Sequence, residues 1–239
     1  MFPEDIVTRM LERYASCVSY EDSGYLENFV EGEERSHGFY LKFRTWYKRP
    51  FQFRFEYISR EFLDAPWSER LVGCDGALAF SKEQGAEVKI QSSLKYAIAE
   101  ANTPSRNSIT QITQHFPDLD LLPIAWLERH KDLMLIGKEF ANNVECYCVA
   151  ASVKNPHDKI IWVSCEDYSL RRIKTYTKVA SSISNEVLDL AKKVALKEVQ
   201  SSDLSATQRP DKRNYIETNY EDVHFNQEIN DAFFAKPLE

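Results

Sequence analysis

Residues 39–58 read FYLKFRTWYKRPFQFRFEYI. Apolar and polar residues alternate on both sides of Arg49-Pro50, which is the pattern of antiparallel strands with one buried face. Because proline cannot donate a hydrogen bond to a β-ladder, we expect the chain to bend between the two strands at this pair. The buried face then gathers a set of large apolar side chains, namely Phe39, Leu41, Phe43, Tyr47, Phe51, Phe53, Phe55 and Tyr57. This face is either packed core or the floor of a ligand pocket, and the alternation does not decide which.

The composition favours a sheet-rich chain with an ordinary core. The 239 residues include 14 Phe and 12 Tyr, which pack well on a pleated surface, and they can form one large domain or two small ones. Only 7 residues are Gly, so a glycine-rich phosphate loop is not expected. The net charge of −7 argues against a nucleic-acid partner, which would require a basic face.

The periodicity along the chain predicts strands together with four helices, an α+β fold. An apolar stripe over 3–18 predicts a first helix, whose inward residues include Tyr14, Cys17 and Val18. Asp75-Gly76 predicts a hairpin with a two-residue turn. The other predicted helices are 92–101, 107–116 and 185–200, and the other predicted strands are 20–30, 36–48, 51–58, 70–74, 77–80, 86–91, 133–140, 144–153, 159–166, 169–179 and 214–223.

No motif for catalysis or metal binding stands out, so we expect a protein that is not an enzyme and that uses no cofactor or metal. The five His residues are scattered, and the five Cys residues match no zinc spacing. Cys146 and Cys148 would share one face of a strand as small buried hydrophobes. Cys165 lies beside Glu166 and Asp167, whose negative charges disfavour a nucleophilic thiolate.

The sequence also bears on the membrane and on location. No apolar run reaches the roughly 18 residues of a membrane span, so a membrane-spanning protein is not expected. The first residues, Met1-Phe2-Pro3-Glu4-Asp5, lack the basic and apolar regions of a secretion signal. The protein is therefore cytoplasmic, or an export signal lies outside this chain.

Several short motifs resemble the LolA/LolB-like family of lipoprotein carriers, and in particular its outer-membrane lipoprotein-sorting-like branch. Tyr20-x-Asp22-x-Gly24 follows the first helix, and the segment Arg49-Pro50-Phe51-Gln52-Phe53-Arg54-Phe55 is the most specific motif. The other motifs are the Asp75-Gly76 hairpin, the helix over 92–101, Ile161-Trp162-Val163-Ser164 and Phe233-Phe234-x-x-Pro237. Together they extend over residues 4–237.

The resemblance implies one LolA-like domain over 1–239: a single curved antiparallel sheet, an unclosed half-barrel, covered by amphipathic helices. A helical insertion is expected at about 182–208. The residues of the buried face would line a hydrophobic cavity for a lipid or lipoprotein acyl chain, and Arg49 would tie the helical lid to the sheet. The implied location is the periplasm or cell envelope. The alternative is a protein-interaction or envelope-assembly module whose core is filled, with an envelope protein as its partner.

Overall fold

The structure, a computed structural model, describes residues 1–30, 38–61, 64–102, 104–105, 108–119, 131–152, 159–177 and 214–237. Most of these residues form one antiparallel sheet of 12 strands, in the order β6-β5-β4-β3-β2-β1-β11-β10-β9-β8-β7, with β12 also paired to β1. The strands are β1 Ser19–Val30, β2 Tyr40–Lys48, β3 Gln52–Arg60, β4 Ser68–Asp75, β5 Ala79–Glu83, β6 Lys89–Gln91, β7 Lys131–Ala141, β8 Val144–Ser152, β9 Lys159–Ser164, β10 Leu170–Thr177, β11 Asn214–Tyr220 and β12 His224–Phe225.

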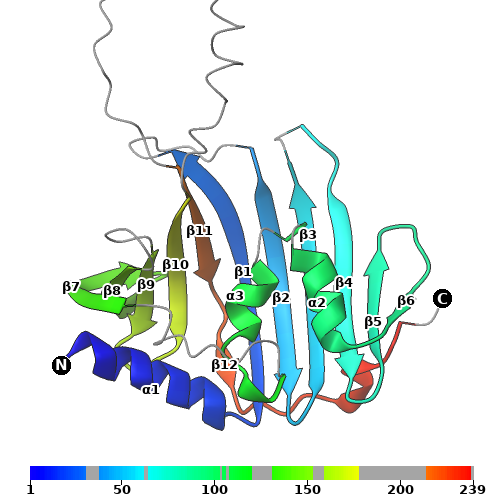
Figure 1. The fold of residues 1–239 in the computed structure, drawn as a ribbon, viewed down its shortest axis with the longest axis horizontal. Helices are drawn as coiled ribbons and strands as arrows, with labels where there is room; N and C mark the ends of the chain where they lie inside the picture. The colour runs from blue at the N-terminus through cyan, green and yellow to red at the C-terminus, as the bar shows by residue number, and fades with distance from the viewer. Residues whose placement is uncertain are drawn as a thin grey trace, which may run out of the picture.

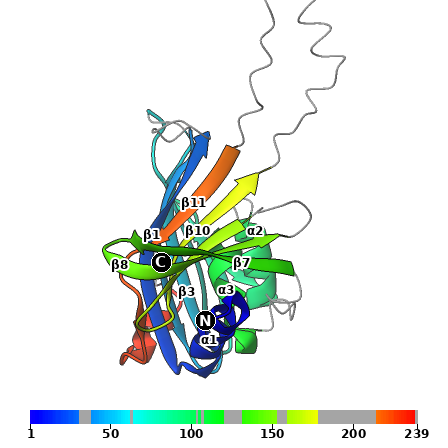
Figure 2. The same cartoon turned by 90° about the vertical axis from the view of Figure 1, so that its left-hand side faces the viewer.

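The sheet is curved and is not closed into a barrel. β6 and β7 lie at its opposite edges, and β7 and β8 turn away from the direction of β1 (Figures 1 and 2). Three α-helices, α1 Pro3–Ser16, α2 Leu94–Asn102 and α3 Ser108–Thr113, lie on one face of this sheet (Figure 1). Two short 3-10 helices, η1 Pro117–Leu119 and η2 Asp231–Phe234, complete the described elements. The predicted α+β half-barrel is confirmed.

Helix α1 carries the predicted apolar stripe, with one correction. Pro3 fits the first turn, and the acidic Glu4 and Asp5 lie near the positive end of the helix dipole. Tyr14 and Cys17 are buried as predicted, but Val18 is 61% exposed. The reason is that the helix ends at Ser16, so the helical periodicity no longer applies to Val18.

Strands β2 and β3 form the hairpin predicted from residues 39–58, with a second correction. Lys48 pairs with Gln52, so residues 49–51 connect the strands and are not part of the ladder. Phe51 belongs to this turn and is 49% exposed, so the prediction that it lies on the buried face is wrong. Alternation holds only within each strand, and the turn interrupts it.

The hairpin between β4 and β5 also has a longer turn than predicted. Cys74 pairs with Ala79, so four residues, 75–78, make the turn. The Asp75 carboxylate closes it by accepting hydrogen bonds from the backbone N–H groups of Ala77 and Leu78, at 2.8 and 2.7 Å. The helix predicted at 185–200 and the insertion predicted at about 182–208 lie outside the described residues.

The C-terminal segment crosses the outer face of the sheet, opposite the three α-helices (Figure 2). There Phe233 packs on Trp46, with ring centroids 4.7 Å apart, and its carbonyl accepts a 3.0 Å hydrogen bond from Arg54. Phe234 is fully buried and belongs to the same cluster as Trp46 and Ile229. This contact places the Phe233-Phe234 motif on the outer face, away from the inner face that the helices cover.

Candidate ligand site between the sheet and the helices

Seven of the eight side chains predicted to line a cavity do share the inner face of the sheet. We call these seven the aromatic floor: Phe39, Leu41, Phe43, Tyr47, Phe53, Phe55 and Tyr57. All are at most 5% exposed. Phe43 stacks on Phe55 across the two strands, with ring centroids 5.8 Å apart, and Phe55 contacts Tyr57 at 5.6 Å. The floor is thus a continuous apolar layer whose rings already contact one another.

Helices α2 and α3 cover the floor with small and aliphatic side chains. Ala97, Ile98 and Ala101 of α2 are buried, as are Ile109 and Ile112 of α3. The helices have 9 and 6 residues, lengths at which an isolated helix is marginal in water, so their stability depends on this packing. They make a thin cover over a large aromatic surface.

Helix α1 is held more firmly than α2 and α3, by an aromatic cluster at the end of the sheet where β12 lies (Figure 1). The Tyr14 ring lies 5.3 Å from Tyr20 of β1, 5.8 Å from Phe116 and 5.1 Å from Phe225 of β12, measured between ring centroids. Tyr47 of the floor stacks on Phe116 at 4.3 Å. The cluster joins α1, the segment after α3 and the sheet into one packed unit.

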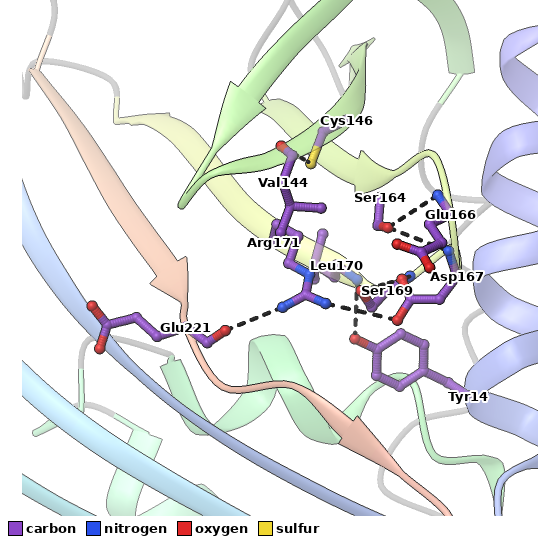
Figure 3. Close-up of polar contacts among 10 residues, drawn as sticks. All are labelled: Tyr14, Val144, Cys146, Ser164, Glu166, Asp167, Ser169, Leu170, Arg171 and Glu221. Atoms are coloured by element: carbon purple, nitrogen blue, oxygen red, sulfur yellow. Dashed lines mark hydrogen bonds and ion pairs between the residues drawn. The ribbon is translucent and has the colours of Figure 1, made fainter.

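A polar network also fixes α1 to the turn between β9 and β10 (Figure 3). The Leu170 backbone N–H donates a 3.2 Å hydrogen bond to the Tyr14 hydroxyl. Within the turn, Asp167 accepts hydrogen bonds from the backbone and side chain of Ser169, at 3.0 and 2.7 Å. Arg171 lies 3.7 Å from the Asp167 carboxylate and donates a 3.1 Å hydrogen bond to the Glu221 carbonyl. These contacts connect α1 to the second half of the sheet.

Arg49 joins the turn after β2 to both helical segments. Its guanidinium forms an ion pair with Asp118 of η1, and it donates hydrogen bonds to the carbonyls of Ala15 and Cys17, the latter at 2.7 Å. The Tyr47 hydroxyl also hydrogen-bonds Asp118, at 3.3 Å. One side chain therefore ties the end of α1 and the segment after α3 to the sheet.

An opening leads toward the floor between α2 and strands β3–β5. It is a cavity of about 240 Å³ whose apolar lining includes Tyr57, Val72, Ala97 and Ala101. Its rim is charged: Arg70 pairs with Glu83 at 2.8 Å and Lys89 with Glu100 at 2.6 Å. The opening therefore has apolar residues in its lining and two ion pairs at its rim.

A larger groove, of about 830 Å³, lies on the outer face of the sheet. One row of outward residues crosses it from β2 to β5, and its members are Arg44, Glu56, Leu71 and Lys82. Arg54 donates a 2.7 Å hydrogen bond to Glu56 within this groove. Its walls carry charges of both signs, as the rim of the smaller opening does, but it lies on the face opposite the aromatic floor.

The inner face holds one carboxylate that the sequence reasoning did not single out as a site residue. Asp22 of β1 is 1% exposed, and the Tyr20 hydroxyl donates a 2.6 Å hydrogen bond to its Oδ2. Its Oδ1 has no hydrogen-bond partner among the described residues, and no described cation pairs with it. Burial raises the pKa of Asp22 to about 7, against the opposing effect of Thr45 and Tyr20. The available signal was its position in Tyr20-x-Asp22-x-Gly24-x-Leu26, which puts it on the buried side.

Two further groups of the described chain surround this carboxyl. Thr45 is opposite Asp22 in the register of β1 and β2, and it is fully buried. Tyr220 of β11 pairs with Gly24, one step along the same face, and its hydroxyl has no hydrogen-bond partner among the described residues. Burial raises the pKa of Tyr220 well above its usual range, and the charge of Asp22 adds to this. We call Asp22, Thr45 and Tyr220 the Asp22 cluster.

The remaining candidates from the sequence are structural. All five Cys residues are free, and Cys146 and Cys148 are buried beside Trp162, as predicted. Over the described residues, no group of three or more His, Cys, Asp or Glu is arranged to hold a metal ion. Among the helices of the described chain, none has the length and apolar character needed to cross a membrane.

Comparisons with known proteins give similarity in structure only. No protein-family model matches the chain, and no curated protein is significantly similar in sequence. Solved structures do match over nearly the full length. One is a LolA superfamily protein. It comes from Nitrosomonas europaea, is 10% identical and has a TM-score of 0.33, with 99% of this chain and 98% of that chain covered.

Two mycobacterial proteins are similar as well. LprF from Mycobacterium bovis is 6% identical with a TM-score of 0.47, covering 99% of this chain and 97% of that one. The lipoprotein LppX from Mycobacterium tuberculosis is 11% identical with a TM-score of 0.45, covering 95% and 97%. At these scores and identities the similarities carry no argument about family or function.

Proposed function

We propose that this protein is a non-enzymatic carrier that binds a hydrophobic ligand, a lipid or lipoprotein acyl chain, between the aromatic floor and helices α2 and α3. The observation that carries the proposal is the opening of about 240 Å³, whose apolar lining includes Tyr57 of the floor and Ala97 and Ala101 of the cover. An acyl chain placed there gains about 0.8 kcal/mol for each buried CH2 group. For the acyl chain to enter, helices α2 and α3 would have to move away from the floor.

In this proposal Arg49 holds the helical cover closed over the sheet. Its contacts with Asp118, Ala15 and Cys17 hold the segment after α3 against the end of α1. We place the carrier in the periplasm or cell envelope, where lipoprotein acyl chains are handled, with the cytoplasm as the alternative. Fractionation of cells that express the native gene, followed by immunodetection, tests the location: recovery in the cytosol alone would contradict it.

The binding test is displacement of an uncharged fluorescent probe, phenylnaphthylamine, by monopalmitoylglycerol. Ala101→Trp places an indole at the opening, and we expect it to weaken displacement by about tenfold or more, because overpacking there excludes the chain. Ala99→Trp is the matched control, since Ala99 lies on the exposed side of the same helix. If no apolar ligand displaces the probe from the wild-type protein, the carrier proposal is wrong.

A second function is favoured by a different observation. The aromatic floor is already filled by its own rings, whereas Met134, Ile136 and Phe140 of the edge strand β7 are 47%, 48% and 70% exposed. This is the arrangement expected of an interaction module with a filled core. Native mass spectrometry separates the two proposals: a protein that carries and exchanges lipid supports the carrier, and a ligand-free protein that remains unable to take up lipid supports the module.

A further inference from the structure

The Asp22 cluster interrupts an otherwise apolar surface. Asp22, Thr45 and Tyr220 come from three adjacent strands, β1, β2 and β11, and all point to the inner face. Around them lie rings: Phe43 contacts Tyr220 at 5.6 Å, and Tyr20 contacts Phe116 at 5.2 Å, between ring centroids. Polar atoms in such a setting are costly unless each finds a partner.

Three of these atoms lack one among the described residues. They are Oδ1 of Asp22, a hydrogen-bond acceptor, and the hydroxyls of Thr45 and Tyr220, each of which both donates and accepts. Tyr220 is one step diagonal to Asp22 across the β1–β11 pair, a separation that an aromatic side chain spans. Oδ1 of Asp22 and the Tyr220 hydroxyl therefore offer an acceptor and a donor to one small polar group placed between them.

We propose that the Asp22 cluster is a polar subsite that holds the uncharged hydroxyl or amide head of an acyl ligand. The proposal rests on the proposed carrier function and names the class of ligand. An O–H or N–H of the head group donates to Asp22 Oδ1, and an oxygen of the same head accepts from the Tyr220 hydroxyl. The acyl chain then extends over the aromatic floor.

The charge around the cluster sets the selectivity. The titratable neighbours on the inner face are Tyr14 of α1, Tyr20 of the same strand as Asp22 and Tyr220 of β11, with Glu21 next in the chain. His115, whose ring lies 5.1 Å from that of Tyr14, belongs to the next layer, and no Lys or Arg is among these groups. A fatty-acid carboxylate would place a second negative charge beside Asp22, and no Lys or Arg is among the groups that act on Asp22. A neutral head meets no such penalty, so the subsite selects monoacylglycerol-like or N-acyl ligands over fatty-acid anions.

The test compares monopalmitoylglycerol with palmitate, two ligands with the same chain length, as displacers of phenylnaphthylamine at about pH 8. We expect the wild-type protein to prefer the glyceride by about tenfold or more, the range for leaving buried polar groups without partners. Asp22→Asn removes the negative charge and should improve palmitate binding, so that the preference falls to about threefold or less. Tyr220→Phe should weaken glyceride binding and leave palmitate binding unchanged.

The matched control is Tyr147→Phe, which removes a hydroxyl from a partly buried tyrosine of β8, on the other half of the sheet. It should keep the wild-type preference. Equal binding of the two ligands by the wild-type protein, or a preference that Asp22→Asn and Tyr220→Phe both leave intact, overturns the subsite while the carrier function stands. Failure of both ligands to displace the probe overturns the carrier function and the subsite together.

Discussion

Replacing Asp22 by Asn should make the protein more stable at neutral and higher pH and change the shape of its pH–stability curve. Asp22 is buried without a paired cation among the described residues, and its pKa rises from 3.8 to about 7 on folding. A carboxyl whose folded pKa is raised binds its proton more tightly in the folded state. The folded protein therefore loses stability as the pH rises from about 4 through about 7.

The magnitude follows from the size of this rise. Each pKa unit corresponds to about 1.4 kcal/mol, so an ionised Asp22 costs on the order of 4 kcal/mol above pH 7. Asn keeps the shape and carries no charge, but its NH2 group needs a partner, which offsets about 1–3 kcal/mol. We expect a net gain of roughly 1–3 kcal/mol in the free energy of unfolding for Asp22→Asn at about pH 8, and a loss of roughly 1–3 kcal/mol near pH 4, where Asp22 carries no charge and only the cost of the Asn NH2 group remains.

Urea denaturation of both proteins at several pH values between about 4 and 9 measures this difference directly. The histidines and other groups titrate in both proteins, so subtraction isolates Asp22. Glu27→Gln is the matched control because Glu27 belongs to the same strand and points to the opposite face; it should change stability by less than about 0.5 kcal/mol at any pH. A difference between wild type and Asp22→Asn that does not vary with pH would refute the reasoning.

Three other predictions concern the floor, the closure and the thiols. Phe55→Ala should cost about 3–5 kcal/mol in urea denaturation because Phe55 is fully buried, whereas Phe51→Ala, in the turn, should cost less than about 0.5 kcal/mol; equal costs would contradict the assignment of Phe51 to the turn. Arg49→Ala should cost about 1–3 kcal/mol and speed hydrogen exchange at the end of α1, since Asp118 and two carbonyls lose their partner; unchanged exchange there would argue against a closing role. In the native protein a thiol reagent should modify Cys165 quickly and the other four thiols only on unfolding, because only Cys165 is not buried; rapid reaction at Cys146 or Cys148, whose pKa values burial raises to about 11 and 12, would show that β8 opens.

The sequence predicted the parts of the fold that depend on short-range periodicity. Within β2 and β3 each inward residue follows from the alternation, because a pleated strand turns every second side chain to the same side. Phe51 was misplaced because the alternation was continued through a turn, where the backbone no longer follows the pleat. The turn at 75–78 was misjudged because Asp75-Gly76 suits more than one turn length, and the pairing of Cys74 with Ala79 decides it.

The candidate site was harder to predict because it depends on contacts between distant segments. Arg49 could be singled out by its place before Pro50, but its partners Asp118 and Ala15 lie far away in the chain. Asp22 and Tyr220 are brought together by the pairing of β1 with β11, almost two hundred residues apart. A charged residue on the inward side of an alternating strand was the one signal that the sequence offered.

The contacts of the three helices determine where the cover could open. α1 is held by the Tyr14 aromatic cluster, by the Leu170 N–H and by Arg49, so moving it would break polar and aromatic contacts together. α2 meets the sheet mainly through Ala97, Ile98 and Ala101, whose burial gains less than that of the rings beneath them. The opening of about 240 Å³ lies at this same helix. A chain that enters the protein would thus move α2 while α1 stays in place, and its head would reach the Asp22 cluster at the end of the floor that α1 holds fixed.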